Sequence, residues 1–480
     1  MTMAETRPAQ PLPLRAAVAP RRLVVVSNRV AGLQHRMPDT GGLAVAMRRV
    51  LAQREGLWFG WSGDVNEAPA KLAVTGGEGL VKIATFDLSS EDFGAYYVGF
   101  SNRVLWPLFH FRSSLVEYSR SALEGYLRVN RMLARTLAPM LAEDDLLWVH
   151  DYHLIPFGEE LRRTGQRQAI GFFLHTPFPP AELFRVLPNH ISLAKALSAY
   201  DLVGFQTPSD CHAFRDYMTR WAGARELGPT ALFAFGRVVR TEVFPVGIDV
   251  EAVARQAAEA DASRHMARLR QSLGERALMI GVDRLDYSKG LLARFDAYGR
   301  LLETYPETRR RTVFMQIAPP SRSEVPEYRN IRRSLEAAAG KINGRYAEFD
   351  WTPLRYLNKS FAHPVLTGFY RASRIAVVTP LRDGMNLVAK EYVASQNPED
   401  PGVLLLSSFA GAAQELSEAV LVNPYDIEGM AEAMQQGLSM PLEERRLRWN
   451  AMMRVLTKND LDAWCQGFLE TLAASAGKGE

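Results

Sequence analysis

The chain has 480 residues, of which 47% are hydrophobic and 23% are charged, and its formal net charge is +4. This length is too great for one ordinary domain, and the composition is typical of a globular protein with two lobes. The positive charges are scattered among acidic residues, which argues against a nucleic-acid groove but allows a local cationic cleft for phosphorylated small molecules.

The cysteine content and the hydropathy exclude several further classes. Two cysteines, Cys211 and Cys465, lie far apart in the sequence, so a disulfide framework and a cysteine-rich metal site are excluded. No apolar run approaches the ~20 residues of a membrane span. Residues 1–21 contain several prolines and no apolar core of a secretory signal, which predicts a disordered leader and a cytoplasmic protein.

The first half of the chain alternates short apolar runs with helical patterns such as 121–141. This alternation predicts βα units and a parallel sheet, in a lobe that covers residues 22–248. The predicted strands, each ending in polar residues, are 23–28, 146–151, 170–175 and 202–206, with 243–248 as the last strand before the chain crosses to a second lobe.

The second half repeats this plan after an Ala-, Arg- and Glu-rich stretch, 250–275, which predicts one long surface helix. We predict a second α/β lobe over 249–440 and helices over 441–480 that pack back toward the first lobe. The fold class is therefore α/β, with two lobes facing a cleft that is lined by the carboxyl ends of both sets of strands. The second-lobe strands are predicted at 278–283, 312–317, 375–378, 403–407 and 419–423.

A strand–loop–helix junction over 375–394 carries two carboxylates. Asp383 lies on the loop, and Glu391 lies about two turns into the helix that starts at Leu387. At such a junction one carboxylate can face a substrate hydroxyl while the other faces a ribose. An ordinary capped helix with solvated acids is the alternative interpretation.

Basic residues and glycines follow other predicted strands. Arg284 and Lys289 share the loop 283–290 and suit a diphosphate, because Arg clamps two oxygens while Lys supplies a point charge. Gly41 and Gly42 open a helical stretch where backbone amides can approach a phosphate. The GxxxxGK[ST] and GxGxxG spacings of common nucleotide loops are absent, and a purely structural role remains the alternative for each motif.

The remaining strand ends supply Arg29, Asp151, His175 and Arg322. The histidines beside Asp151 suggest zinc, but their spacing does not support it. Four cations would balance a nucleotide sugar together with a sugar phosphate, while the carboxylates are available for neutral hydroxyls. The residues therefore predict a transferase that carries a sugar from a nucleotide to a phosphorylated acceptor.

Several long motifs occur in one order along the chain: Ser27-Asn-Arg29, Gly41-Gly-Leu43, Trp58-Phe-Gly-Trp-Ser-Gly63, Phe100-Ser-Asn-Arg-Val-Leu-Trp-Pro-Leu-Phe-His110, His150-Asp-Tyr-His153, Arg284-Leu-Asp-Tyr-Ser-Lys-Gly290 and Arg382-Asp-Gly-Met-Asn-Leu-Val-Ala-Lys-Glu391. In these motifs, from about residue 22 to 470, the chain resembles the trehalose-6-phosphate synthases. These are retaining glycosyltransferases with two Rossmann-like lobes, the GT-B architecture.

The resemblance implies a donor site, an acceptor site and a small catalytic set. The implied donor-site residues are Gly41, Gly42, His175, Arg284, Lys289, Asp383, Asn386, Leu387 and Glu391. The implied acceptor-site residues are Arg29, Trp61, Tyr97, Trp106, Asp151 and Arg322. Catalysis would involve Arg284, Lys289, Asp151, His175 and Asp383, with no metal and no other cofactor.

The implied reaction is transfer of glucose from UDP-glucose to glucose-6-phosphate with retention, giving α,α-trehalose 6-phosphate and UDP, the first step of trehalose biosynthesis. A separate phosphatase would act downstream, and no nucleic-acid or membrane partner is expected; a homo-oligomer remains open. The sequence does not separate UDP from ADP or GDP. The alternatives are a glucosylglycerol-phosphate synthase that uses glycerol-3-phosphate and a catalytically silent sugar-phosphate sensor. Three features depart from the family pattern, namely Thr176, Phe111 and a short loop over 30–40.

Overall fold

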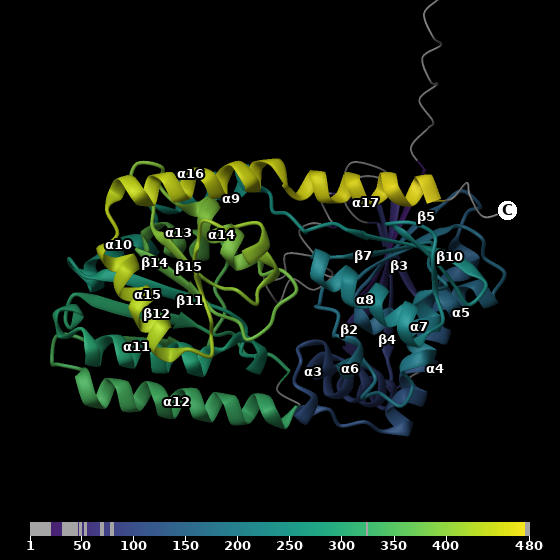
Figure 1. The fold of residues 1–480 in the computed structure, drawn as a ribbon, viewed down its shortest axis with the longest axis horizontal. Coiled ribbons are helices and arrows are strands. Elements are labelled where there is room, and N and C mark those ends of the chain that lie inside the picture. Colours follow the sequence, from purple (N-terminus) through teal and green to yellow (C-terminus); the bar gives the residue numbers. More distant parts are fainter. Residues whose placement is uncertain are drawn as a thin grey trace, which may run out of the picture.

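The computed structural model describes residues 21–30, 47, 50–51, 55–67, 72–76, 81–322 and 325–475. Two sheets with helices packed around them lie side by side (Figure 1), which confirms the predicted α/β class with two lobes. The leader predicted at 1–21 falls almost wholly outside the described residues. Within the described part of the chain, no helix is long and apolar enough to cross a membrane.

In the described part of the chain, the first sheet has ten strands in the order β3-β4-β2-β1-β5-β6-β7-β10-β9-β8. The run from β4 to β10 is parallel, and antiparallel strands close both edges. Numbered along the chain, the seven parallel strands follow the order 3-2-1-4-5-6-7, which is the 3-2-1-4-5-6 order of a doubly wound sheet extended by β10, and the order reverses between β1 and β5. The bounds are β1 (Leu23–Arg29), β2 (Gly56–Val65), β3 (Ala73–Gly76), β4 (Val81–Leu88), β5 (Leu146–His150), β6 (Ala169–Phe173), β7 (Leu202–Phe205), β8 (Arg225–Glu226), β9 (Ala231–Ala234) and β10 (Arg237–Val243).

Among the residues that the structure describes, the second sheet has six strands, all paired in parallel, in the order β13-β12-β11-β14-β15-β16. This is again the 3-2-1-4-5-6 order, and the reversal lies between β11 and β14. Ligands bind beyond the carboxyl ends of the strands at such a reversal. The bounds are β11 (Ala277–Val282), β12 (Thr312–Ile317), β13 (Leu354–Leu357), β14 (Ile375–Val378), β15 (Val403–Ser407) and β16 (Val420–Val422).

Helices connect the strands in both lobes. In the first lobe they are α2 (Ser90–Asp92), the π-helix η1 (Phe93–Leu105), α3 (Trp106–Phe109), η2 (Ser113–Leu115), α4 (Arg120–Leu137), η3 (Ala138–Met140), η4 (Tyr152–Leu154), α5 (Phe157–Arg163), α6 (Ala181–Phe184), α7 (His190–Leu197) and α8 (Pro208–Trp221). From there on they are α9 (Val250–Ala260), α10 (Arg264–Leu273), η5 (Tyr287–Lys289), α11 (Leu291–Thr304), η6 (Pro306–Thr308), α12 (Pro326–Tyr346), α13 (His363–Ala372), α14 (Leu387–Ser395), η7 (Gly411–Gln414), α15 (Ile427–Ser439), α16 (Leu442–Lys458) and α17 (Leu461–Ser475).

Two predicted elements were wrong. The run 243–248 is not a strand, because β10 ends at Val243 and Pro245 has no N–H to continue the pairing. The helix expected over 250–275 is two helices. Ser263 caps the start of α10 through its side chain, which accepts a hydrogen bond from the N–H of Met266, and this local bond competes with a continuous helix.

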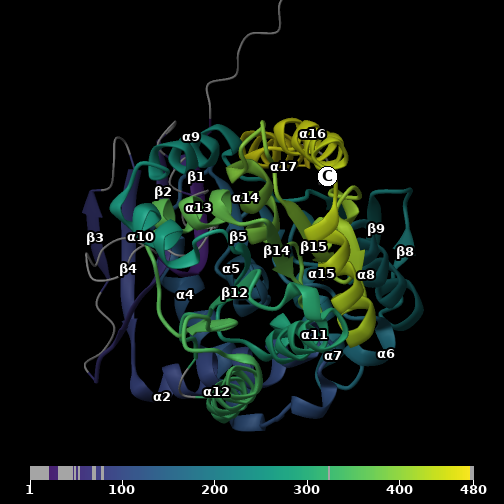
Figure 2. The same ribbon diagram turned by 90° about the vertical axis from the view of Figure 1, so that its left-hand side faces the viewer.

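The C-terminal helices cross from one lobe to the other, as predicted. Helix α16 lies along the second lobe and α17 along the first, on the side of the molecule opposite to α12 (Figures 1 and 2). Phe468 of α17 stacks on Trp148 with ring centroids 4.7 Å apart. A Cβ on Gly171 or Gly204 would lie within 2.8 Å of the Phe468 ring, so the bare backbone of β6 and β7 accommodates this side chain. The exact lobe boundaries, at 248/249 and 440/441, remain predictions.

Candidate active site

The two lobes meet through their main chains at the carboxyl ends of the strands. Gly384 follows β14, and His175 follows β6. A Cβ on Gly384 would lie 2.1 Å from the carbonyl oxygen of His175, so only glycine permits this approach. The strand ends of both sheets therefore face a common cleft.

The second-lobe side of the cleft holds an ion pair whose two side chains are only 12% and 13% exposed. The Nζ of Lys289 lies 2.5 Å from Oδ2 of Asp383, and Nδ2 of Asn386 donates to the same oxygen at 3.0 Å. Burial by itself raises the pKa of Asp383, but the Lys289 charge and these hydrogen bonds outweigh it and leave the pKa below its ordinary value. Asp383 is therefore a carboxylate that accepts hydrogen bonds only.

The loop after β11 positions Arg284 and Lys289 differently. Lys289 ends the short turn η5, and Gly290 (φ +66°) follows as the N-cap of α11. Arg284 is exposed, and its guanidinium carbon lies 5.8 Å from the centroid of the Trp106 ring in the first lobe. One cation is thus anchored by a carboxylate, while the other reaches across the cleft over an aromatic face.

The N-terminus of α14 is built by Asn386. This residue adopts φ +89°, and its Oδ1 accepts a hydrogen bond from the N–H of Ala389 at 3.1 Å. Leu387 begins the helix, where first-turn amides favour an anion. Further along, Glu391 lies 3.5 Å from Nε2 of His363, and this hydrogen bond raises the pKa of His363.

Two first-lobe residues, Asp151 and His175, follow neighbouring strands. Asp151 has φ +76°, and its Oδ1 accepts from the N–H of His175 at 3.3 Å. Desolvation raises the pKa of Asp151 to about 6, against the opposing effect of backbone hydrogen bonds and of Arg322. Burial lowers the pKa of His175 to about 3, so its ring is neutral at pH 7. The Nδ1 of buried His150 lies 3.1 Å from Nε2 of His175.

Aromatic rings line the first-lobe side of the cleft. Tyr97 projects from η1, and its ring lies 5.5 Å from Trp61 and stacks on His153 at 6.0 Å. Arg29, at the exposed end of β1, lies 5.9 Å from the Trp61 ring. Pi-helical segments are rare in proteins, and those that occur are often found at functional sites. The predicted acceptor residues Arg29, Trp61 and Tyr97 therefore lie together.

Arg322 is held by its backbone conformation and by several side-chain contacts. It adopts φ +45°, a conformation that costs a non-glycine residue on the order of 1–3 kcal/mol. Its guanidinium carbon lies 3.8 Å from the Trp106 ring centroid, and Nη2 donates to the hydroxyl of Tyr152 at 3.3 Å. Among the described atoms, its Nε is buried without a hydrogen-bond partner.

The structure thus brings most of the predicted residues together, and it adds others. Gly41, Gly42 and residues 31–40 of the short loop lie outside the described residues, so their placement stays a prediction. Sequence reasoning gave no role to Asp286, which binds Arg322, although Asp286 lies within the 283–290 motif. The region that the structure covers contains no cluster of three or more His, Cys, Asp or Glu side chains arranged to hold a metal ion.

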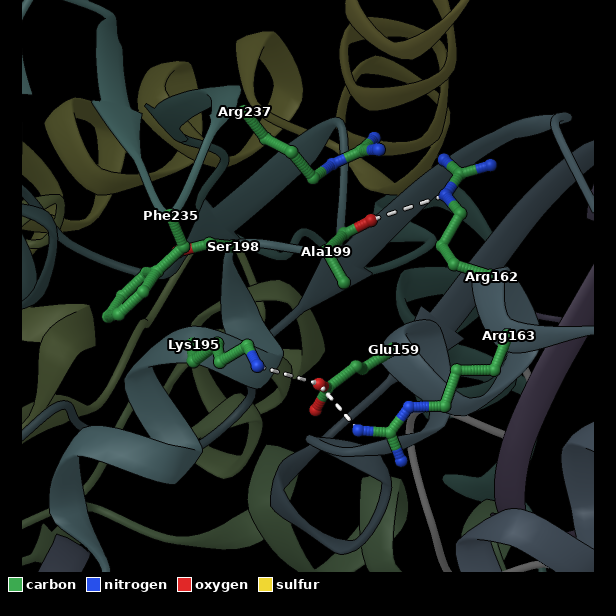
Figure 3. Close-up of a pocket in the computed structure, with 8 residues that line it drawn as sticks. All are labelled: Glu159, Arg162, Arg163, Lys195, Ser198, Ala199, Phe235 and Arg237. Carbon is green, nitrogen blue, oxygen red and sulfur yellow. Dashed lines mark hydrogen bonds and ion pairs between the residues drawn. The ribbon is translucent and has the colours of Figure 1, made fainter.

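A separate pocket of about 270 Å³ lies on the first lobe (Figure 3). It is near the amino ends of β6 and β7, because Arg162 donates to the carbonyl of Gln168 just before β6. Its cations pair with the protein's own carboxylates: Arg162 and Arg237 share Asp201, and Arg163 binds Glu159. The pocket therefore lies away from the cleft, at the amino ends of the strands of the first sheet, whereas the cleft lies at their carboxyl ends.

The chain is similar to glycosyltransferases over nearly its whole length. The sequence model of glycosyltransferase family 20 matches residues 21–474. The trehalose-6-phosphate synthase of Sodalis glossinidius (strain morsitans) is 48% identical over 459 residues, 96% of this chain and 97% of that protein. The α,α-trehalose-phosphate synthase (UDP-forming) of Burkholderia vietnamiensis superposes with a TM-score of 0.93 at 49% identity, covering 95% of this chain and 98% of that one.

A second solved structure is that of the α,α-trehalose-phosphate synthase (UDP-forming) of Burkholderia xenovorans in complex with glucose-6-phosphate. It superposes with a TM-score of 0.91 at 48% identity and covers 94% of this chain and 99% of that one. These similarities confirm the family and the two-lobe GT-B architecture that the motifs predicted. The chain therefore belongs to glycosyltransferase family 20.

Proposed function

We propose that the chain is an α,α-trehalose-phosphate synthase that transfers glucose from UDP-glucose to glucose-6-phosphate with retention and releases UDP. One observation carries the proposal: two cations that belong to separate sites lie over the same indole ring. The guanidinium carbons of Arg284 and Arg322 are 5.8 Å and 3.8 Å from the centroid of Trp106. Two anionic groups can therefore bind next to each other, as the transfer of a sugar between two phosphorylated substrates requires.

The donor would bind on the second lobe. Arg284 and Lys289 would hold the diphosphate, assisted by the amides at the start of α14 and by Gly41 and Gly42. Glu391 would bind the ribose. Asp383 would accept hydrogen bonds from the glucose hydroxyls, and the neutral ring of His175 would donate or accept one. The UDP-forming relatives support UDP as the nucleotide.

The acceptor would bind on the first lobe. Arg29, Tyr97, Trp106 and Arg322 would form the phosphate pocket, and Trp61 and Asp151 would contact the sugar. The glucose-6-phosphate complex of the Burkholderia xenovorans enzyme supports this acceptor over the smaller glycerol-3-phosphate.

In the transfer step the acceptor hydroxyl would attack the anomeric carbon from the face that the diphosphate leaves. The bond from that carbon to the phosphate oxygen breaks, the new glycosidic bond forms, and the hydroxyl proton passes to an oxygen of the departing diphosphate. No protein nucleophile or base is needed in this scheme. The protein contributes positioning and the stabilisation of negative charge that develops on the diphosphate, chiefly through Arg284 and Lys289.

The proposal includes a reaction without a metal ion, since the cations of Arg284 and Lys289 would face the diphosphate. Activity that is unchanged by EDTA supports this part, and activity that is lost with EDTA and restored by Mg²⁺ overturns it. The product keeps the acceptor's phosphate, so a separate phosphatase must act if free trehalose is formed. Both substrates are charged metabolites that do not cross membranes unaided, which supports a cytoplasmic location.

The first experiment combines purified protein with UDP-glucose and either glucose-6-phosphate or glycerol-3-phosphate, with proton NMR of the products. UDP release with glucose-6-phosphate and two α-anomeric signals supports the proposal. Release with glycerol-3-phosphate alone assigns the alternative synthase. Absence of turnover with UDP-, ADP- and GDP-glucose indicates a sugar-phosphate sensor.

A further inference from the structure

Asp286 is a fully buried carboxylate between the two proposed substrate sites. It lies in the loop after β11, between Arg284 and Lys289, and its exposed fraction is 0%. A buried carboxylate must be paired and hydrogen-bonded to be tolerated. The hydrogen-bond partners of its two carboxylate oxygens therefore identify the groups that Asp286 holds in place.

One oxygen of Asp286 closes the turn that carries Lys289. Its Oδ1 accepts a hydrogen bond from the N–H of Ser288 at 3.0 Å, and its main-chain carbonyl accepts one from the N–H of Lys289 at 3.1 Å. The same residue thus fixes η5 through both its side chain and its backbone. The position of Lys289, and of the ion pair between Lys289 and Asp383, depends on this turn.

The other oxygen of Asp286 holds Arg322. Its Oδ2 accepts from Nη1 of Arg322 at 3.2 Å and from the hydroxyl of Tyr328 at 2.9 Å. The Tyr328 hydroxyl in turn accepts from Nη1 of Arg322 at 2.6 Å. This triangle is one of the contacts that hold Arg322 in its left-handed conformation and against Trp106.

We infer that Asp286 is a positioning residue that couples the two substrate sites, because one carboxylate orders both the turn of Lys289 and the guanidinium of Arg322. This inference rests on the proposed function for the identity of the two ligands. Asp286 acts through Lys289 and Arg322 and need not touch either substrate. Binding at one site then restrains the carboxylate that orders the other, so UDP and glucose-6-phosphate should each tighten the binding of the other by the same factor.

The negative charge of Asp286 allows a decisive test, because the two roles that the carboxylate could have, electrostatic masking and positioning, predict opposite changes in phosphate affinity when it is removed. A carboxylate beside Arg322 reduces the positive charge that a phosphate meets, so removal of an electrostatic mask should tighten phosphate binding. Removal of a positioning group should weaken it. Asp286→Asn separates the two roles, since its carbonyl oxygen can still accept from Ser288 while its NH₂ cannot accept from Arg322.

The experiment measures the Kd of glucose-6-phosphate by calorimetry with and without saturating UDP, for the whole chain and its variants. In the unmodified protein we expect UDP to tighten binding about fivefold or more. Asp286→Asn should weaken binding of glucose-6-phosphate about tenfold and bring the coupling factor close to one. Asp283→Asn is the matched control, because Asp283 is 5% exposed in the same loop and binds Arg294 at 2.8 Å. It should lower the melting temperature and leave the coupling unchanged.

Tyr328→Phe decides the question if Asp286→Asn does not fold, because it removes one hydroxyl from the triangle and leaves the η5 cap. It should weaken glucose-6-phosphate binding and reduce the coupling without changing the Kd of UDP. The inference is overturned if the deciding variant binds glucose-6-phosphate more tightly or with unchanged affinity. It is also overturned if that variant binds glucose-6-phosphate more weakly but keeps the original coupling factor. Independent binding of the two ligands to the unmodified protein would overturn it as well. Failure of the unmodified protein to bind glucose-6-phosphate at all would instead refute the proposed function.

Discussion

At the residue scale, the cationic groups of the cleft differ in how strongly the protein itself holds them. Lys289 is bound to Asp383 and Arg322 to Asp286, whereas Arg284 is exposed and touches the cleft through the Trp106 ring. A cation that is already paired with a protein carboxylate has less uncompensated positive charge to offer to a ligand. Arg284 therefore has the most charge to offer to a diphosphate whose negative charge grows during the reaction.

Arg284→Ala should lower kcat about 100- to 1000-fold, the loss typical of one group that stabilises transition-state charge. The KM for UDP-glucose should change far less, because the interaction strengthens only as the diphosphate departs. Steady-state kinetics check both values. Arg284→Lys keeps the charge and loses the forked geometry, so its kcat should lie between those of the unmodified protein and the alanine variant. An alanine variant with near-normal turnover would remove Arg284 from the mechanism.

The pair of His363 and Glu391 predicts a pH-dependent stability. The Glu391 hydrogen bond raises the pKa of His363 in the folded protein, so folding favours the protonated ring. The stabilisation is fully present below the unfolded pKa of about 6.5 and is lost as the pH rises through the higher folded pKa. The difference in melting temperature between the unmodified protein and Glu391→Gln should therefore be largest near pH 5.5 and vanish at alkaline pH. The same difference at every pH would contradict this assignment.

At the scale of single elements, the start of α14 depends on one side chain. Asn386 supplies a left-handed φ, a cap for Ala389 and a hydrogen bond to Asp383. Asn386→Ala should destabilise the protein by about 1–2 kcal/mol through the lost cap, and further through the positive φ. Asn386→Gly tolerates that φ and should cost less. Urea unfolding compares the two, and an alanine variant as stable as the glycine variant would contradict the strained-cap interpretation.

The elements that sequence predicted best are those buried on both faces. The runs at Thr312–Ile317, Ile375–Val378 and Val403–Ser407 are strands with those bounds, because fully buried parallel strands are continuous apolar stretches. The prediction failed at 243–248, where an apolar run contains Pro245. It also missed β2 (Gly56–Val65) as a strand, although part of it was named as a family motif and Trp61 as an implied acceptor-site residue.

The candidate site was predictable in its membership and not in its internal contacts. The motif loops lie at the two points where strand order reverses, so their residues converge in both lobes. The bond between Asp286 and Arg322 links residues from different loops and requires the left-handed backbone of Arg322. Sequence patterns carry little information about either condition, which explains why Asp286 was missed.

At the scale of the whole molecule, α17 fastens the end of the chain to the first lobe. Phe468 is fully buried and stacks on Trp148. Phe468→Ala should reduce the free energy of unfolding by about 3–5 kcal/mol, whereas Leu447→Ala on α16, where the side chain is 66% exposed, should change it by no more than about 0.5 kcal/mol. Urea denaturation measures both. Similar losses for the two variants would show that α17 contributes little to the first lobe.

At Gly384 and the carbonyl of His175 the two lobes contact each other through main-chain atoms. Peptide groups have the same dimensions in every sequence, so this spacing does not drift when surrounding side chains are exchanged. A protein with 48% of its residues in common still superposes with a TM-score of 0.91. The distance between the two lobes at this point of this chain therefore depends on backbone geometry, and the side chains around it can be exchanged without changing that distance.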